Sequence, residues 1–352
     1  MLRNPKSEIT FMPTDLTPAD PAPVLDLLIA FRRSKTMFAA VSLGVFDALA
    51  AGPKSLADLS GQLQANPEAL ERLLDACVGL QLLQKTGGSY ENTAASAAYL
   101  CQGSPQRLTG YLKYSNTVMW KLWEKLEDAV REGTNRWQQV YGWEGPIFSH
   151  FFRTEEAKRE FLMGMHGFGL MSSPVVVSAF DLGRFESFVD LGGATGHLAI
   201  AACQRYPQMR ATVFDLPEAV PLAREIVGAS SVVDRVTIAA GDFFADPLPA
   251  GDLFALGRIL HDWSEEKIVK LLARIFERLP SWGGLLIAEK LLFDDQTGPA
   301  WAQMQNLNML TCTEGKERTL AQYDALLKTA GFADVQAYRT SLPLDAVLAM
   351  KG

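Results

Sequence analysis

The length, composition and charge of the chain limit what it can be. It has 352 residues, 48% of them hydrophobic, which allows two domains with sizeable cores. The net charge of −7 argues against a nucleic-acid partner, because phosphate contacts need clustered Lys and Arg side chains. No apolar run approaches the roughly 20 residues of a membrane helix, so we predict no membrane partner.

The N-terminus and the cysteines favour a cytoplasmic protein without a metal. Residues 1–20 lack the unbroken apolar stretch of a signal peptide, and we expect them to form a flexible arm. No C-x-x-C or H-E-x-x-H motif occurs, so no metal site is predicted. The cysteines are far apart in the sequence, which indicates reduced thiols: Cys77, Cys101, Cys203 and Cys312.

The first long helix is predicted within residues 21–50. Apolar residues recur there at helical spacing, as at Leu25, Leu28 and Ile29. A small domain cannot bury that much apolar surface in its own core. We therefore expect this helix to pack against a second copy of the chain.

Two shorter helices and a hairpin follow. Ser55 with Asp58 three residues later is a capping signature, and Asn66 before a proline marks another helix start. Gly87 and Gly88 then separate two short strand-like segments, which predicts a hairpin. Helix, turn, helix and hairpin together predict an all-α winged-helix-like domain over residues 21–104.

A winged helix can bind DNA or another protein. Residues 1–100 contain eight Lys or Arg and ten Asp or Glu. The second short helix, "PEALERLLDACVGL", carries one Arg against three acids. A helix that enters the major groove should be more basic than that, so we predict dimerisation rather than DNA binding.

Residues 105–180 are predicted to be helical. In "VMWKLWEKLEDAVREGTN" the apolar residues Trp120, Trp123, Leu126 and Val130 form one helical stripe. A later stretch is rich in Met, Phe and Gly and includes Met165. Such stripes more often build a core than a pocket, although Met and aromatic side chains also form adaptable walls for flat apolar ligands.

From residue 188 onward the pattern changes to alternating strands and helices. This alternation predicts a doubly wound α/β sheet, whose ligand lies beyond the C-terminal ends of the strands. The last two strands follow each other closely, so one of them should be antiparallel. The predicted strands cover residues 188–192, 211–216, 236–242, 253–260, 285–292, 334–340 and 345–352.

The turn after the first of these strands indicates the type of cofactor. In "FVDLGGATGHLAI" the dinucleotide fingerprint G-x-G-x-x-G fails, because Leu191 takes the place of its first glycine. A nicotinamide cofactor is therefore not expected. The turn instead has an acid followed by glycines at Gly192, Gly193 and Gly196, and glycines let a ligand approach the backbone closely. The acid, Asp190, suits a cationic ligand better than a pyrophosphate.

Two further acids end the next strands. Asp215 lies where a carboxylate can bind ribose hydroxyls, and Asp242 is followed by Phe243, which can pack on a base. Strand ends often carry Asp, so each acid alone is weak evidence. Together around one glycine turn they predict a ligand with an adenosine part and a positive charge, which describes S-adenosylmethionine (SAM).

The order of several motifs resembles one enzyme family. "DLGGATG", "VFDLPEAV", "GDFFADPLP", "LGRILHDWSEEK" and "LNMLTCTEGKERT" occur with suitable gaps. The chain resembles the acetylserotonin-type and plant-type small-molecule O-methyltransferases from about residue 25 onward. The resemblance implies a Rossmann-like methyltransferase domain over residues 105–352, with a helical acceptor-pocket segment at 105–180 and a SAM-binding core at 181–352. It also implies a homodimer.

The resemblance further implies roles for individual residues. Cofactor contacts would come from Asp190, Gly192, Gly193, Asp215, Leu216, Asp242, Phe243 and Arg258. His261 would be the general base, oriented by the flanking acids Glu289 and Glu317. The small acceptor would lie against Asp262, Asn308, Met304, Cys312 and Met165.

The chemistry of methyl transfer agrees with a histidine at this place. A sulfonium methyl group is displaced in line by an acceptor oxygen that must lose its proton. A free phenol has a pKa of about 10, so an imidazole that takes the proton is useful. A carboxylate on the other ring nitrogen would fix the tautomer.

Departures from the family pattern leave the acceptor open. Ala194 and Trp282 replace residues common in the family, and neither should block SAM. Cys312 stands where acetylserotonin-type enzymes tend to carry Gln, which puts acetylserotonin itself in doubt. The expected acceptor is a hydroxyindole, a phenol or a polyketide-like molecule. The alternative is an enzyme of the same fold that methylates carbon or nitrogen, or that catalyses a different SAM-assisted reaction.

Overall fold

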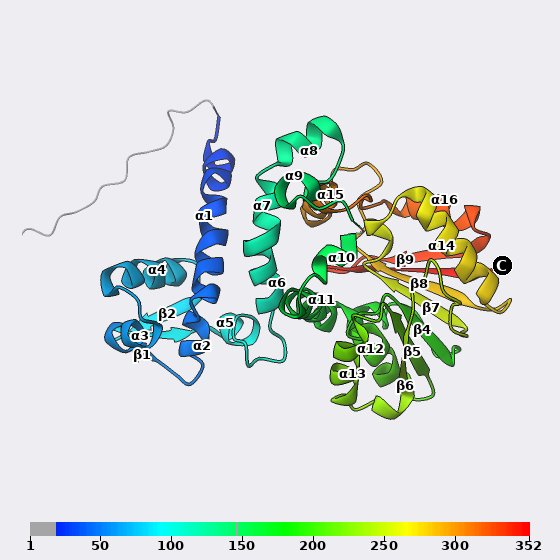
Figure 1. Ribbon diagram of the computed structural model, residues 1–352, viewed down its shortest axis with the longest axis horizontal. Coiled ribbons are helices and arrows are strands. Elements are labelled where there is room, and N and C mark those ends of the chain that lie inside the picture. Colours follow the sequence, from blue (N-terminus) through cyan, green and yellow to red (C-terminus); the bar gives the residue numbers. More distant parts are fainter. Residues whose placement is uncertain (1–18, 146) are drawn as a thin grey trace, which may run out of the picture.

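A computed structural model describes residues 19–145 and 147–352. The expected N-terminal arm therefore lies almost entirely outside the described residues. Figure 1 shows a small N-terminal part in blue and cyan, which stands beside a larger part built on one sheet. In the described part of the chain, no helix combines the length and apolarity that crossing a membrane would require.

The N-terminal part contains the predicted helices and a small sheet. Ser55 and Asp58 form a reciprocal capping box, and Asn66 caps the next helix start. The predicted hairpin turns at Gly87 and Gly88, both with positive φ. The hairpin strands and a short third strand form a sheet in the order β1-β3-β2, so this part is not purely α-helical. Its elements are α1 (Ala22–Ser42), α2 (Val45–Ala48), β1 (Lys54–Ser55), α3 (Leu56–Leu63), α4 (Pro67–Gly79), β2 (Leu83–Thr86), β3 (Ser89–Asn92) and α5 (Ala94–Tyr99).

The middle segment is helical as predicted but more broken than its apolar stripe suggests. A π-helical turn spans Ser115–Met119, and the chain breaks again between α7 and α8. The expected single stripe was wrong, because these breaks rotate the later residues away and leave Val130 62% exposed. The helices are α6 (Thr109–Tyr114), α7 (Trp120–Trp123), α8 (Leu126–Glu132), α9 (Trp137–Tyr141), α10 (Ile147–Phe151) and α11 (Glu155–Val176).

The predicted doubly wound sheet has seven strands in the order β6-β5-β4-β7-β8-β10-β9. β10 is antiparallel to both of its neighbours, β8 and β9, which identifies the antiparallel strand. The order reverses beside β4, and ligands bind at such a switch point. The strands are β4 (Ser187–Leu191), β5 (Arg210–Asp215), β6 (Val236–Ala240), β7 (Leu253–Gly257), β8 (Gly284–Glu289), β9 (Phe332–Tyr338) and β10 (Asp345–Lys351).

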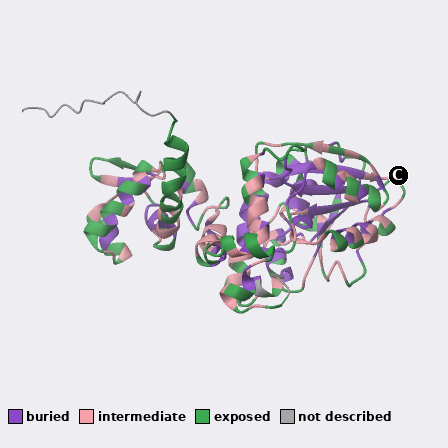
Figure 2. Ribbon diagram, turned by 90° about the horizontal axis from the view of Figure 1, so that it is seen from above, coloured by how far each residue is buried: buried purple, intermediate pink, exposed green. Residues whose placement is uncertain are grey.

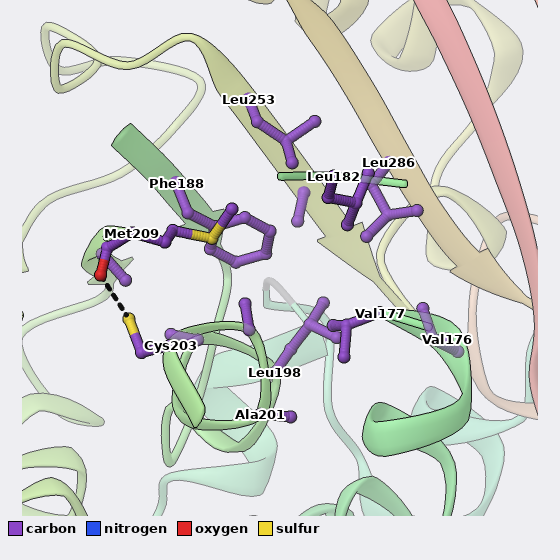
Figure 3. Close-up of a cluster of buried hydrophobic side chains, with 14 of the residues drawn as sticks. Val176, Val177, Leu182, Phe188, Leu198, Ala201, Cys203, Met209, Leu253 and Leu286 are labelled. Carbon is purple, nitrogen blue, oxygen red and sulfur yellow. Dashed lines mark hydrogen bonds between the residues drawn. The ribbon is translucent and has the colours of Figure 1, made fainter. Parts of the chain in front are cut away.

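Helices cover both faces of this sheet, which is why its central strands are mostly apolar and buried. One buried cluster joins α11 and α12 to the sheet through Val176, Leu198 and Phe188 (Figure 3). A second cluster lies on the other face and includes Ile268 and Tyr323. Figure 2 shows the strands as buried and most of α1 as exposed. The covering helices after β4 are α12 (His197–Arg205), α13 (Val220–Gly228), α14 (Glu265–Arg278) and α16 (Leu320–Thr329). The remaining long helix, α15 (Ala300–Cys312), packs against α7 and α8 of the middle segment instead (Figure 1).

Candidate active site

A cavity of about 450 Å³ opens at the C-terminal ends of the parallel strands. One wall comes from the turns that follow β4, β5, β6 and β7, and the other comes from the helical middle segment and α15. The polar lining residues include Asp215, Asp242, Arg258, His261, Asp262, Gln305 and Asn308. Residues that lie far apart in the sequence therefore face one enclosed space.

The glycine turn after β4 forms part of this wall. Gly192 has a φ of +67°, and a side chain there would collide with Ile259. A Cβ at Gly193 would stand 2.7 Å from the Asp190 carboxylate. The turn thus needs glycine for its backbone conformation and for its close packing. Gly192 and Ala194 line the cavity, whereas Gly193 faces Asp190.

Asp190 lies beneath the turn, and the described cavity wall does not include it. Its Oδ2 accepts a hydrogen bond from the Ala199 N–H at 3.3 Å. Burial raises the pKa of Asp190 to about 7. This carboxyl therefore contacts the protein beneath the turn, whereas the sequence predicts it at the cofactor. The sequence could not separate the two positions, because they differ only in which way the side chain points.

Asp215 and Asp242 lie in the cavity wall, as the strand-end argument predicts. Asp215 accepts hydrogen bonds from the Ala194 and Leu216 N–H groups, both at 2.7 Å, and burial raises its pKa to about 6. Its carboxylate thus ties the ends of β4 and β5 together at the ligand edge. Asp242 Oδ1 accepts from the backbone two residues on, beside the lining ring of Phe243.

His261 lies in a short 3-10 turn after β7 and is buried. Its Nδ1 is 2.6 Å from Glu317 Oε1, while its Nε2 is 3.8 Å from Asp262 Oδ1. Burial lowers the pKa of His261, but the negative charges of Glu317, Asp262 and Glu289 raise it, to about 9. Because Glu317 occupies Nδ1, Nε2 is the nitrogen left for a molecule in the cavity.

Glu289 holds the backbone of this turn rather than the imidazole ring. Its Oε1 accepts from the consecutive N–H groups of Ile259, Leu260 and His261 at 3.1, 2.7 and 3.2 Å. Glu317 alone of the two predicted acids bonds the ring, so the two orient His261 in different ways. His261, Glu289 and Glu317 bring ligand-type atoms within 4.8 Å of one another, and these hydrogen bonds account for the grouping without an ion.

One face of α15 forms part of the cavity wall. Gln305, Asn308, Met309 and Cys312 line the cavity at helical spacing. Asn308 Oδ1 accepts from the Trp123 indole at 2.9 Å, and the Cys312 thiol donates to the Asn308 carbonyl at 3.1 Å. Burial raises the pKa of the Cys312 thiol, which keeps it protonated.

Of the two methionines expected at the acceptor, only Met165 lies in the described cavity wall. Met165 lines the cavity, whereas Met304 is 55% exposed and is not among the described lining residues. Met304 sits one turn of α15 before Asn308. Arg258 lines the cavity with a φ of +58° and stacks over Phe168 at 5.6 Å.

The cavity wall carries three buried N–H donors, of which sequence reasoning named only that of Arg258. Arg258 Nε, Trp263 Nε1 and Gln305 Nε2 have no hydrogen-bond partner within the described residues. Trp263 and Gln305 were not singled out, because an indole or an amide carries no spacing signal. Unpartnered donors in a cavity are free to bind oxygen or nitrogen atoms of a ligand.

A glycine turn at the switch point, acids at successive strand ends and a buried histidine in the same cavity define a class. They are the parts of a SAM-dependent methyltransferase.

Comparisons with known proteins agree. Residues 123–333 match the family model of an O-methyltransferase domain, and residues 25–102 match an O-methyltransferase dimerisation domain. Acetylserotonin O-methyltransferase of Bos taurus is 41% identical, over 91% of this chain and 95% of its own length. A human "probable bifunctional dTTP/UTP pyrophosphatase/methyltransferase protein" is 40% identical over 95% of this chain, which spans only 54% of that protein.

The fold comparison gives the same result. The crystal structure of human N-acetylserotonin methyltransferase in complex with SAM superposes with a TM-score of 0.90 at 39% identity. The match covers 97% of this chain and 100% of the other. The chain therefore belongs to the family of SAM-dependent O-methyltransferases.

Proposed function

We propose that the protein moves a methyl group from SAM to a hydroxyl of a small aromatic acceptor, with His261 as general base. The acceptor is a hydroxyindole, a phenol or a polyketide-like molecule. The observation that carries this proposal is the buried His261–Glu317 pair, which leaves Nε2 of the cavity-lining His261 side chain without a hydrogen bond from the described residues.

SAM fits the wall made by the strand-end turns. Asp215, with the adjacent Leu216, would accept hydrogen bonds from the ribose, and Asp242 and Phe243 would contact the adenine. Gly192 would lie against the methionine part, because it brings bare backbone to the cavity surface. The guanidinium of Arg258 would bind the carboxylate of SAM, since Arg258 Nε lacks a partner within the described residues.

The aromatic character of the opposite wall supports a flat acceptor. Phe151 and Phe161 stack with their centroids 4.2 Å apart, and both line the cavity beside Met165. Asp262, Asn308 and Cys312 add polar atoms on the same side. An aromatic ring held between these groups would present its hydroxyl to His261.

The proposed reaction needs one proton transfer and one displacement. His261 Nε2 accepts the hydroxyl proton as the acceptor oxygen attacks the methyl carbon. The carbon–sulfur bond breaks, and its electron pair stays on sulfur to give S-adenosylhomocysteine. Glu317 stabilises the imidazolium that forms, because the carboxylate already receives the Nδ1–H.

We also propose that the enzyme works as a homodimer through residues 21–104. The match of residues 25–102 to a dimerisation domain supports this, as do the exposed apolar residues of α1. A second copy would cover them: Val24, Leu25, Leu27, Leu28, Ile29 and Phe31.

The test is transfer of a labelled methyl group from SAM to a panel of hydroxyindoles, catechols, hydroxycinnamates and hydroxyquinones. We expect label on one hydroxyl class and a loss of at least about a hundredfold in a His261→Ala variant that still binds SAM. Full turnover in that variant would contradict the base assignment. Label on carbon or nitrogen instead of oxygen would contradict the proposed acceptor group.

A further inference from the structure

The carboxylate that fixes the His261 turn is itself held by a buried tyrosine. Glu289 uses Oε1 for the three N–H groups of residues 259–261, as described above. Its other oxygen, Oε2, accepts a hydrogen bond from the hydroxyl of Tyr323. Glu289 and Tyr323 are both fully buried, so solvent offers no replacement for this donor.

Tyr323 occupies a fixed place in the fold. It lies in the first turns of α16, whose start is fixed by a reciprocal capping box between Thr319 and Gln322. The Arg318 guanidinium stands 6.0 Å from the Tyr323 ring centre. Arg318 Nη1 also donates to the Leu260 carbonyl at 3.2 Å. Two residues near the start of α16 thus support the His261 turn. Tyr323 contacts the N–H groups of the turn through Glu289, and Arg318 bonds the Leu260 carbonyl.

We propose that Tyr323 is a positioning residue for methyl transfer: its hydroxyl holds the Glu289 carboxylate in the orientation that places His261. Tyr323 is not among the described residues of the cavity wall, so it acts through Glu289 and not on a ligand. The inference rests on the proposed role of His261 as the base. A base displaced by about 1 Å can lose on the order of a hundredfold in rate, so a support of this kind affects turnover.

The test compares Tyr323→Phe with Tyr206→Phe. Tyr206 is a matched control in the same domain, because its hydroxyl donates to the carbonyls of Val177 and Phe180 at 3.0 Å, away from the site. Hydrogen–deuterium exchange is measured on peptides that cover residues 257–263. We expect faster exchange of the Ile259, Leu260 and His261 amides in Tyr323→Phe only, because Glu289 then loses its anchor.

Steady-state kinetics provide the second readout. We expect kcat to fall about tenfold or more in Tyr323→Phe while the KM for SAM stays unchanged, since the cofactor wall is intact. Unchanged amide exchange at residues 259–261 would overturn the proposal. Equal loss of kcat in Tyr206→Phe, or loss of exchange protection across the whole domain, would also overturn it, because either result indicates a merely structural role.

The two proposals fail separately. If exchange at the turn increases as expected but the wild-type protein methylates no hydroxyl, the positioning of the His261 turn by Tyr323 stands and the proposed reaction fails. If the wild-type protein is active and the exchange data do not change, the reaction stands and the role of Tyr323 fails.

Discussion

Glu317 Oε1 lies 2.6 Å from His261 Nδ1, and both residues are buried. This contact fixes which ring nitrogen faces the cavity, and it places a negative charge beside an imidazole that must gain a proton.

The activity should rise with pH because His261 acts as a base only when it is neutral. Burial lowers its pKa and the surrounding carboxylates raise it to about 9, so the neutral fraction grows as the pH approaches that value. Bound SAM adds a positive charge to the cavity and should lower the pKa of His261. We expect kcat to reach its plateau at a lower pH than the His261 ring titration measured by NMR without SAM.

Glu317→Gln should shift the pH dependence of kcat to still lower pH. The substitution removes the largest of the charges that raise the pKa of His261, so the rising limb of kcat shifts to lower pH. The plateau should drop at least about tenfold, since the tautomer is no longer fixed. Glu314→Gln is the matched control, because Glu314 bonds the Ser264 N–H and Lys267 instead of the ring. A pH profile of Glu317→Gln that matches wild type would refute the assignment.

Gly315→Ala should displace the backbone turn that carries His261. A Cβ at Gly315 would collide with the His261 carbonyl oxygen and stand 2.7 Å from the Trp263 backbone nitrogen. The His261 turn must then shift, at a cost of about 1–3 kcal/mol in stability and at least about tenfold in kcat. Gly228→Ala is the control, since nothing lies within 4 Å of its added Cβ. Denaturant melts and turnover measurements check both variants. Wild-type stability and kcat in Gly315→Ala would show that Gly315 does not pack closely against the backbone of His261 and Trp263.

Two neutral histidines should make the fold sensitive to acid. Burial lowers the pKa of His166 to about 4, and His166 Nδ1 is 2.8 Å from Thr195 Oγ1 in the glycine turn. The unfolded chain takes up this proton near pH 6.5, before the folded chain does. The free energy of unfolding therefore falls as the pH drops from about 6.5 to 4, by up to about 1.4 kcal/mol per unit for this group.

His166→Gln removes that titration while keeping a hydrogen-bonding side chain opposite Thr195. The buried carboxyls titrate alike in both proteins, so their effect cancels in the difference. Urea unfolding at several pH values should show wild type losing stability relative to the variant below pH 6.5. Parallel curves would mean that His166 is not held neutral. His197, whose pKa burial lowers to about 3, should behave in the same way.

The apolar face of α1 should control assembly. Leu27 is 72% and Leu28 61% exposed in the single chain, and a dimer interface would bury both. A Leu27→Asp, Leu28→Asp double variant should be monomeric by light scattering, because a buried unpaired charge is strongly unfavourable. Val130→Asp places the same charge on another exposed apolar site and should leave the oligomeric state unchanged. A dimeric double variant would place the interface elsewhere.

The sequence by itself determined the sheet and the edge at which the ligand binds. Strands and helices alternate along the chain, and parallel strands must end at the same edge. The positions of Asp215, Asp242 and His261 after successive strands therefore predicted that they face one space, and the structure places all three in the same cavity wall. The tight turn after β4 was also predictable, because Gly192 and Gly196 suit the positive φ that such a turn needs.

Only the tertiary structure decided which way individual side chains point and which distant groups meet. Asp190 and Met304 carry the right residue types, but one turns beneath the glycine turn and the other toward solvent. Glu289 and Glu317 make different contacts, and Tyr323 bonds Glu289, only because three distant segments meet when the sheet and its helices pack together. Periodicity reports the face of one helix or strand, whereas hydrogen bonds between elements depend on how several elements pack together.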